Sequence, residues 1–222
     1  MIVAQRKIIP EILEKLKYHK KILVLGCGTC VTVCLAGGER EVCIIASALR
    51  MASKLHGYSL DIEELTIERQ CDNIFIEMAA EATERNDAVL SLGCGAGVQA
   101  VAERYPYKPV YAGLDTAFIG ILEERGVWTE KCIACGECVL SDYGGICPVA
   151  RCAKRLLNGP CGGSKEDRCE VSPDRECAWQ LIYRRLKDIG QLDRLKNIAV
   201  PKSWNKSRDG GYRVIIRDDH RI

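Results

Sequence analysis

The stretch CIACGECVLSDYGGICPVARCAKRLLNGPCGGSKEDRCEVSPDREC, residues 132–177, contains eight of the fourteen cysteines in this chain. The eight are Cys132, Cys135, Cys138, Cys147, Cys152, Cys161, Cys169 and Cys177. The first three have the spacing C-x2-C-x2-C, and the fourth is followed by Pro148. Bacterial iron–sulfur runs use the same triplet and the same Cys-Pro ending, with a shorter gap before the last cysteine. The stretch therefore predicts iron–sulfur ligands, and a ferredoxin fold does not follow from it.

Three other uses of these eight thiols compete with that interpretation. A structural zinc ion binds four thiolates, usually from two CxxC-like pairs. The C-x2-C-x2-C triplet supplies one such pair and leaves its third thiolate without a partner in that pattern. Disulfides are rare in the cytosol, where we expect this chain because its N-terminus lacks an apolar signal region. One or two free buried cysteines are common in a protein, but eight within residues 132–177 are not expected to be free. We expect two [4Fe-4S] clusters here, with zinc as the alternative in one site, and the spacing does not assign cysteines to clusters.

Charge is divided unevenly along the 222 residues. Residues 1–149 carry 15 Lys and Arg against 20 Asp and Glu, whereas residues 150–222 carry 17 against 10. The basic part either balances anionic clusters or forms a docking face for an acidic electron donor such as ferredoxin. The candidate docking residues flank the cysteines: Arg151, Lys154, Arg155, Lys165 and Arg168. No run of apolar residues is long enough to span a membrane, and no nucleic-acid partner is expected.

The first 125 residues have the pattern of an α/β domain. Apolar runs at 21–26, 88–92 and 108–113 predict buried strands, with a further strand at 58–67. Helical periodicity predicts helices at 5–19, 39–55, 71–85 and from about 97, and a short helical piece is expected up to about 125. The alternation predicts a Rossmann-like, doubly wound parallel sheet over 1–125. Residues 126–222 are then a cysteine-rich iron–sulfur domain with C-terminal helices and a tail.

A third metal site is predicted in the α/β domain. The stretches ILVLGCGTCV and VLSLGCGAGV are similar, and they place Cys27 and Cys94 just beyond two strand ends, where open parallel sheets bind ligands. Cys30 and Cys34 share the turn after the first of these strands. These four thiols could hold a cluster or zinc, although a Gly-Cys-Gly turn could simply be tight. Cys43 and Cys71 lie within helical patterns and are expected in the core.

The segments CIACGECVLSDYGGICPVARCAK and LNGPCGGSKEDRCEVSPDRECAWQLIYRRLKDIGQLDRL resemble a known family. They are similar to the cysteine-rich C-terminal domain of methylenetetrahydrofolate reductase, and specifically to the small iron–sulfur subunit (MetV type) of the acetogen-type enzyme. GCGTCVTVC and GCGAGVQAV are similar to the same family. The resemblance implies a separate flavin-binding subunit that reduces methylene-tetrahydrofolate in one-carbon metabolism of the Wood–Ljungdahl type.

Both lines of argument predict a cytoplasmic electron-transfer subunit that has no flavin and no catalytic residues of its own. Clusters pass single electrons, and hydride chemistry is left to a cofactor on another chain. The alternative is a zinc-binding structural or assembly subunit of the same reductase complex. A further alternative is an independent enzyme with a reactive cysteine or exposed cluster.

Overall fold

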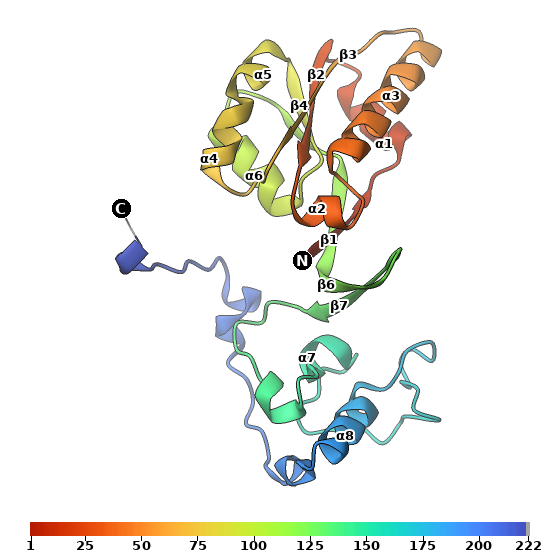
Figure 1. The fold of residues 1–222 in the computed structure, drawn as a ribbon, viewed down its shortest axis with the longest axis vertical. Coiled ribbons are helices and arrows are strands. Elements are labelled where there is room, and N and C mark those ends of the chain that lie inside the picture. The colour runs from red at the N-terminus through yellow and green to blue at the C-terminus, as the bar shows by residue number, and fades with distance from the viewer. Residues whose placement is uncertain (221–222) are drawn as a thin grey trace. The chain divides into compact units, whose positions relative to one another are not determined.

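The computed structural model describes residues 1–220 and divides into two compact units (Figure 1). Unit 1 comprises Met1–Thr129, and unit 2 begins at Glu130. The boundary expected at residues 125 and 126 falls in the turn between two strands, ahead of this division. Within the described residues no helix is long and apolar enough to cross a membrane.

Unit 1 is built on a four-stranded parallel sheet. Its strands are β2 (Lys21–Cys27), β3 (Asp61–Ile67), β4 (Ala88–Ser91) and β5 (Val110–Ala112). The order is β3-β2-β4-β5. β3 pairs with one edge of β2, and β4, the next strand in the chain, pairs with the opposite edge of β2. The predicted apolar strands are therefore confirmed, and the direction of winding reverses between β2 and β4.

Helices cover both faces of this sheet (Figure 1). Along β2, Ile22 and Val24 face a hydrophobic cluster with α1 (Ile9–Leu16) and α3 (Glu39–Leu55). Leu23 and Leu25 face a second cluster, formed with the helices of the opposite face. Those helices are α4 (Asn73–Ile76), the 3-10 turn η1 (Glu77–Ala79), α5 (Ala80–Arg85) and α6 (Gly95–Arg104). Side chains alternate across a strand, so an apolar run such as KILVLG serves both layers at once.

An antiparallel sheet was not predicted. It has the order β1-β6-β7, formed by β1 (Ile2–Arg6), β6 (Leu114–Glu124) and β7 (Val127–Cys132). The expected helical piece before residue 125 is wrong, because this segment is β6. Gly126 has φ 91° in the turn after β6, where glycine supports a tight hairpin. Gly120 packs so closely against the Thr129 carbonyl that a Cβ would collide.

Unit 2 contains little regular structure. Its helices are α7 (Pro148–Arg151) and α8 (Ala178–Asp188), with the 3-10 turns η2 (Leu140–Tyr143), η3 (Leu192–Lys196), η4 (Trp204–Lys206), η5 (Arg208–Gly210) and η6 (Asp218–His220). The expected C-terminal helices correspond to α8 and the 3-10 turn η3, and Gly190 has φ 67° between them. One hydrophobic cluster joins Tyr143, Cys177, Trp179, Ile182 and Leu186. Most of the remaining chain in residues 130–220 is loop.

Candidate metal centres

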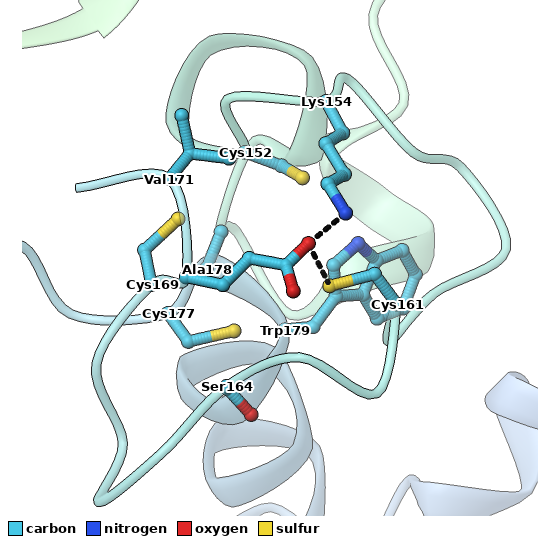
Figure 2. Close-up of a pocket in the computed structure, with 10 residues that line it drawn as sticks. Cys152, Lys154, Cys161, Ser164, Cys169, Val171, Cys177, Ala178 and Trp179 are labelled. Carbon is cyan, nitrogen blue, oxygen red and sulfur yellow. Dashed lines mark hydrogen bonds and ion pairs between the residues drawn. The ribbon is translucent and has the colours of Figure 1, made fainter. Parts of the chain in front are cut away.

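Four cysteines of unit 2 line one pocket (Figure 2). Cys152 follows α7, Cys177 immediately precedes α8, and Cys161 and Cys169 lie in the loop that connects these helices. The sequence predicted all four as ligands without grouping them. Their convergence on one pocket separates them from the four earlier cysteines of the stretch.

Backbone hydrogen bonds hold the loop that carries Cys169. The Cys169 N–H donates to the carbonyl of Arg175 at 2.9 Å, and the Cys177 N–H donates to that of Asp167 at 2.7 Å. Glu166 and Asp167 have φ of 49° and 65°, in the left-handed region that residues other than glycine seldom occupy. Conformations of this kind persist where the surroundings determine them, as at ligand sites. The loop path thus brings Cys169 and Cys177 to the same pocket.

Polar and aromatic side chains complete the pocket. Lys154 pairs with the Glu170 carboxylate, whose Oε1 lies 3.7 Å from the Cys161 Sγ. Trp179 lines the pocket, and its Nε1–H donates to the Leu156 carbonyl at 3.2 Å. Tyr143 meets the Trp179 ring edge-on, with centroids 5.5 Å apart. The thiols therefore have a fixed apolar wall on one side and an ion pair beside them.

The earlier four cysteines lie at the end of β7 and along the loop that follows it. Cys132 and Cys138 are exposed, and Cys135 and Cys147 are half-buried. The N–H of Ala134 donates to the Cys132 Sγ at 3.3 Å, and that of Ala150 donates to the Cys147 Sγ at 3.4 Å. Hydrogen bonds to sulfur favour the thiolate, which is the form that binds metal.

The C-terminal tail fastens this loop with basic side chains. Lys202, whose side chain is 3% exposed, donates to the Glu137 carbonyl, and the Lys206 Nζ lies 3.2 Å from the Glu137 Oε1. The hydrogen bond from Lys206 lowers the pKa of Glu137. Arg213 donates to the Ala134 carbonyl at 2.8 Å. No pattern in the sequence indicated these contacts, because 65 or more residues separate the partners.

The predicted docking residues are all exposed. Besides Lys154, they are Arg151, Arg155, Lys165 and Arg168. Arg168 makes a weak contact with the Asp174 carbonyl at 3.5 Å, and Arg155 has φ 53°. Lys154 is paired with Glu170, whereas the charges of Arg151, Arg155, Lys165 and Arg168 are exposed to a partner. All five lie in the same segment as the cysteine pocket.

In unit 1, three of the four predicted thiols lie at one edge of the parallel sheet. Cys27 ends β2, Cys30 begins α2 (Cys30–Val33), and Cys94 immediately precedes α6. Cys34 is buried in the same hydrophobic cluster as Cys27, with its Sγ 3.8 Å from the Ala4 carbonyl oxygen and 3.6 Å from that of Val31. Burial raises the pKa of the Cys34 thiol.

The prediction that Cys43 and Cys71 are core residues is wrong, because both are exposed. Cys43 lies on the outer side of α3, and Cys71 lies in the segment that follows β3. The helix expected from residue 71 begins only at Asn73, so Cys71 stands before it. Across residues 1–220, no group of three or more Cys, His, Asp or Glu side chains is already arranged to hold a metal ion. Ligation at the sheet edge or in the pocket therefore requires side-chain rotation, and of the thiols there Cys71 and Cys161 are exposed whereas Cys27 and Cys177 are buried.

Residues 111–205 match the family described as methylene-tetrahydrofolate reductase C terminal. The match includes all eight cysteines of the 132–177 stretch and most of unit 2. No curated protein and no solved structure matches the chain. The comparison associates this part of the chain with that reductase family, in agreement with the resemblance seen in the sequence.

Proposed function

We propose that this chain is the electron-transfer subunit of a methylenetetrahydrofolate reductase complex. It carries two [4Fe-4S] clusters in unit 2 and passes electrons to a flavin-binding subunit, as in Wood–Ljungdahl type one-carbon metabolism. The family match over residues 111–205 supports the association with the reductase. The observation that carries the electron-transfer role is the pocket lined by four cysteines, beside a second set with iron–sulfur spacing.

The proposed ligand groups follow the structure. Cys152, Cys161, Cys169 and Cys177 hold one cluster, because they line the same pocket. Cys132, Cys135, Cys138 and Cys147 hold the other. This second group has the C-x2-C-x2-C triplet and Cys-Pro ending, and N–H donors already point at two of its sulfurs. Four thiolates are the usual ligand set of a four-iron cluster.

The residues around each group have distinct roles in this proposal. When bound, the clusters supply one-electron chemistry. Trp179 keeps water from one side of its pocket, and Lys154 offsets the negative charge of the Glu170 carboxylate beside Cys161. The N–H groups of Ala134 and Ala150 stabilise thiolate charge at the other group. Exposed Arg151 and Arg155 attract an acidic donor such as ferredoxin.

In this proposal unit 1 is a folded α/β domain of the reductase complex and carries out no folate or hydride chemistry. Strand order β3-β2-β4-β5 with helices on both faces supports a doubly wound, Rossmann-like fold for this unit. In the proposal this unit belongs to the cytoplasmic reductase complex, and the folate and hydride chemistry takes place on the flavin subunit.

Metal analysis of anaerobically purified full-length protein tests the proposal. We expect about eight irons and as much sulfide from the two groups, with broad visible absorption that dithionite bleaches. Cys135→Ser and Cys169→Ser should each lose roughly four irons, and the Cys135→Ser/Cys169→Ser double variant roughly eight.

The grouping has its own control. Cys161→Ser/Cys169→Ser should lose no more iron than Cys169→Ser alone, since both serve one cluster. Cys43→Ser should keep the full content, because Cys43 is exposed on α3. A colourless, zinc-loaded protein would replace this function with the alternative, a zinc-binding assembly subunit of the same complex.

A further inference from the structure

Three neighbouring strands of unit 1 each lead to a cysteine at the same edge of the sheet. Cys27 is the last residue of β2, Cys94 comes three residues after β4, and Cys71 comes four residues after β3. The strands are parallel and adjacent, in the order β3-β2-β4, so their carboxyl ends share one edge. Cys30, the first residue of α2, belongs to the turn after β2. This edge is where the winding of the sheet reverses, and such edges bind ligands in open parallel sheets.

A buried glutamine fixes the segment that carries Cys71. Gln70 is completely buried, its Nε2 donates to the Leu25 carbonyl of β2 at 2.8 Å, and its Oε1 accepts from the Ser91 Oγ of β4 at 2.6 Å. The chain after β3 therefore crosses over β2 to reach β4. Gly93 and Gly97 leave room for this side chain, since a Cβ at either would collide with it. Cys71, the next residue, is held beside the turn that carries Cys94.

The end of β2 is tied to the same segment. The Gly28 N–H donates to the Ile67 carbonyl at 2.9 Å, and the Cys27 Sγ lies 4.0 Å from the Glu68 carbonyl oxygen. The turns after β2, β3 and β4 therefore bring their cysteines to one edge of the sheet. Thiolates gathered at one edge are stabilised by a bound cation.

We propose that Cys27, Cys30, Cys71 and Cys94 form a four-thiolate centre for a thiophilic metal, either one zinc ion or the iron of a cluster. Cys71 takes the place that the sequence assigned to Cys34, whose sulfur is buried against backbone carbonyls. The centre is independent of the clusters proposed for unit 2, since it uses none of their ligands. The shared chemistry is a set of four cysteine thiolates, which both zinc and iron–sulfur centres accept.

Metal analysis of full-length variants tests this ligand set. Iron, sulfide and zinc are measured in the anaerobically purified wild type and in Cys71→Ser, Cys34→Ser and Cys43→Ser. We expect Cys71→Ser to lose about one zinc or roughly four irons, and the other two variants to keep the wild-type content. Zinc loss and iron loss both support the site and identify its metal. Full metal in Cys71→Ser, or loss in Cys34→Ser, overturns the proposal.

A second measurement on the wild type covers the case in which Cys71→Ser does not fold. Alkylation by iodoacetamide is mapped by mass spectrometry in protein as purified anaerobically and after chelation. Cys71, Cys27 and Cys94 should be labelled at least about tenfold more slowly with metal bound, because coordination consumes the thiolate nucleophile. Exposed Cys43 is the matched control and should react equally in both samples. Equal labelling of Cys71 in both samples would rule the site out, whatever the iron content of unit 2.

Discussion

The two units of this chain hold their cysteines in opposite ways. In unit 1 two hydrophobic clusters enclose the parallel sheet, and Cys27 is one of many residues in the larger cluster, at the edge of an already packed fold. In unit 2 one small cluster forms around α8, and Cys177 is itself part of it. Burial of apolar surface is the main stabilising term in folding, and small cores rarely suffice without metals or disulfides. The difference favours a unit 1 that folds on its own contacts, and under the proposed function unit 2 depends on the clusters that its thiols bind.

Backbone conformation supports the same contrast. The non-glycine residues with left-handed φ are Leu35, Ala134, Arg155, Glu166 and Asp167. All of these except Leu35 lie among the cysteines of unit 2, in loops that hydrophobic packing does not hold in place. Left-handed conformations of this kind cost of order 1–3 kcal/mol each and need surroundings that determine them. Under the proposed function, the bound clusters of unit 2 are the surroundings that hold these loops.

Metal removal should therefore have the largest effect, and it should be confined to one unit. After anaerobic chelation, we expect amides of α8 and α7 to exchange with solvent within seconds, while those of β2 and β4 stay protected. The reason is that metal-binding free energy is folding free energy in a domain with so small a core. Hydrogen exchange read by mass spectrometry on the full chain measures both units in one sample. Protection of α8 that survives metal loss would abolish the contrast.

The sequence predicted the part of the fold that apolar runs determine. The run KILVLG makes up β2 except for its last residue, Cys27, and the run DAVLSLG contains β4. Residues 39–55 are α3 with the bounds expected. The antiparallel sheet was missed because β6 has only intermittent buried positions, and its identity depends on pairing with the distant β1. Such pairing is tertiary context, which overrides local propensity.

For the candidate sites too, sequence spacing predicted the ligand residues only in part, and tertiary structure determined the rest. Spacing alone marked the eight cysteines of unit 2, but their grouping required the loop path set by the bonds of Cys169 and Cys177. In unit 1, proximity in sequence selected Cys34, whereas the crossing of the Gln70 segment brings Cys71 to the sheet edge. The sequence did place Cys71 shortly after a predicted strand. That position indicates a site residue only once β3 is known to lie next to β2.

Charge provides a second way to sharpen the comparison. Residues 1–129 carry 14 Lys and Arg against 17 Asp and Glu, and residues 130–222 carry 18 against 13. Arg151→Glu/Arg155→Glu should slow reduction by ferredoxin severalfold to about tenfold at low salt, because long-range attraction accelerates encounter. The wild-type rate should fall in the same way as salt rises, since exposed charges are screened over about 8–10 Å. Stopped-flow absorbance measures both rates.

The matched control for this prediction places the same charge change in unit 1. Arg40→Glu, at an exposed position of α3, should alter the ferredoxin rate much less than Arg151→Glu alone. Reduction by a small uncharged dye should be the same in all variants. Equal slowing by Arg40→Glu would mean that overall charge matters and that no docking face exists in unit 2.

The smallest expected effect concerns the basic tail over the Cys132–Cys138 loop. Lys206→Met removes one positive charge beside Glu137. Because Lys206 lowers the pKa of Glu137, the carboxyl of the wild type stays ionised to a lower pH than an ordinary glutamate. Without the lysine its pKa returns upward toward the ordinary value, and the carboxyl still carries its charge at pH 7. The variant therefore differs from the wild type by one charge near the cysteines, with no change in protonation at that pH.

Reduction adds negative charge to a cluster, so loss of a nearby cation makes reduction harder. We expect Lys206→Met to lower the potential of the cluster held by Cys132, Cys135, Cys138 and Cys147 by on the order of 20–50 mV, a partly screened value for exposed charges. Lys196→Met is the matched control, because Lys196 is an exposed lysine of unit 2 paired with Asp193 and not with Glu137. Redox titration followed by electron paramagnetic resonance resolves the two clusters. A shift in the other cluster alone, or the same shift in Lys196→Met, would show that the tail does not act on this loop. A shift confined to the cluster proposed for Cys132, Cys135, Cys138 and Cys147 would show that the basic tail tunes that cluster.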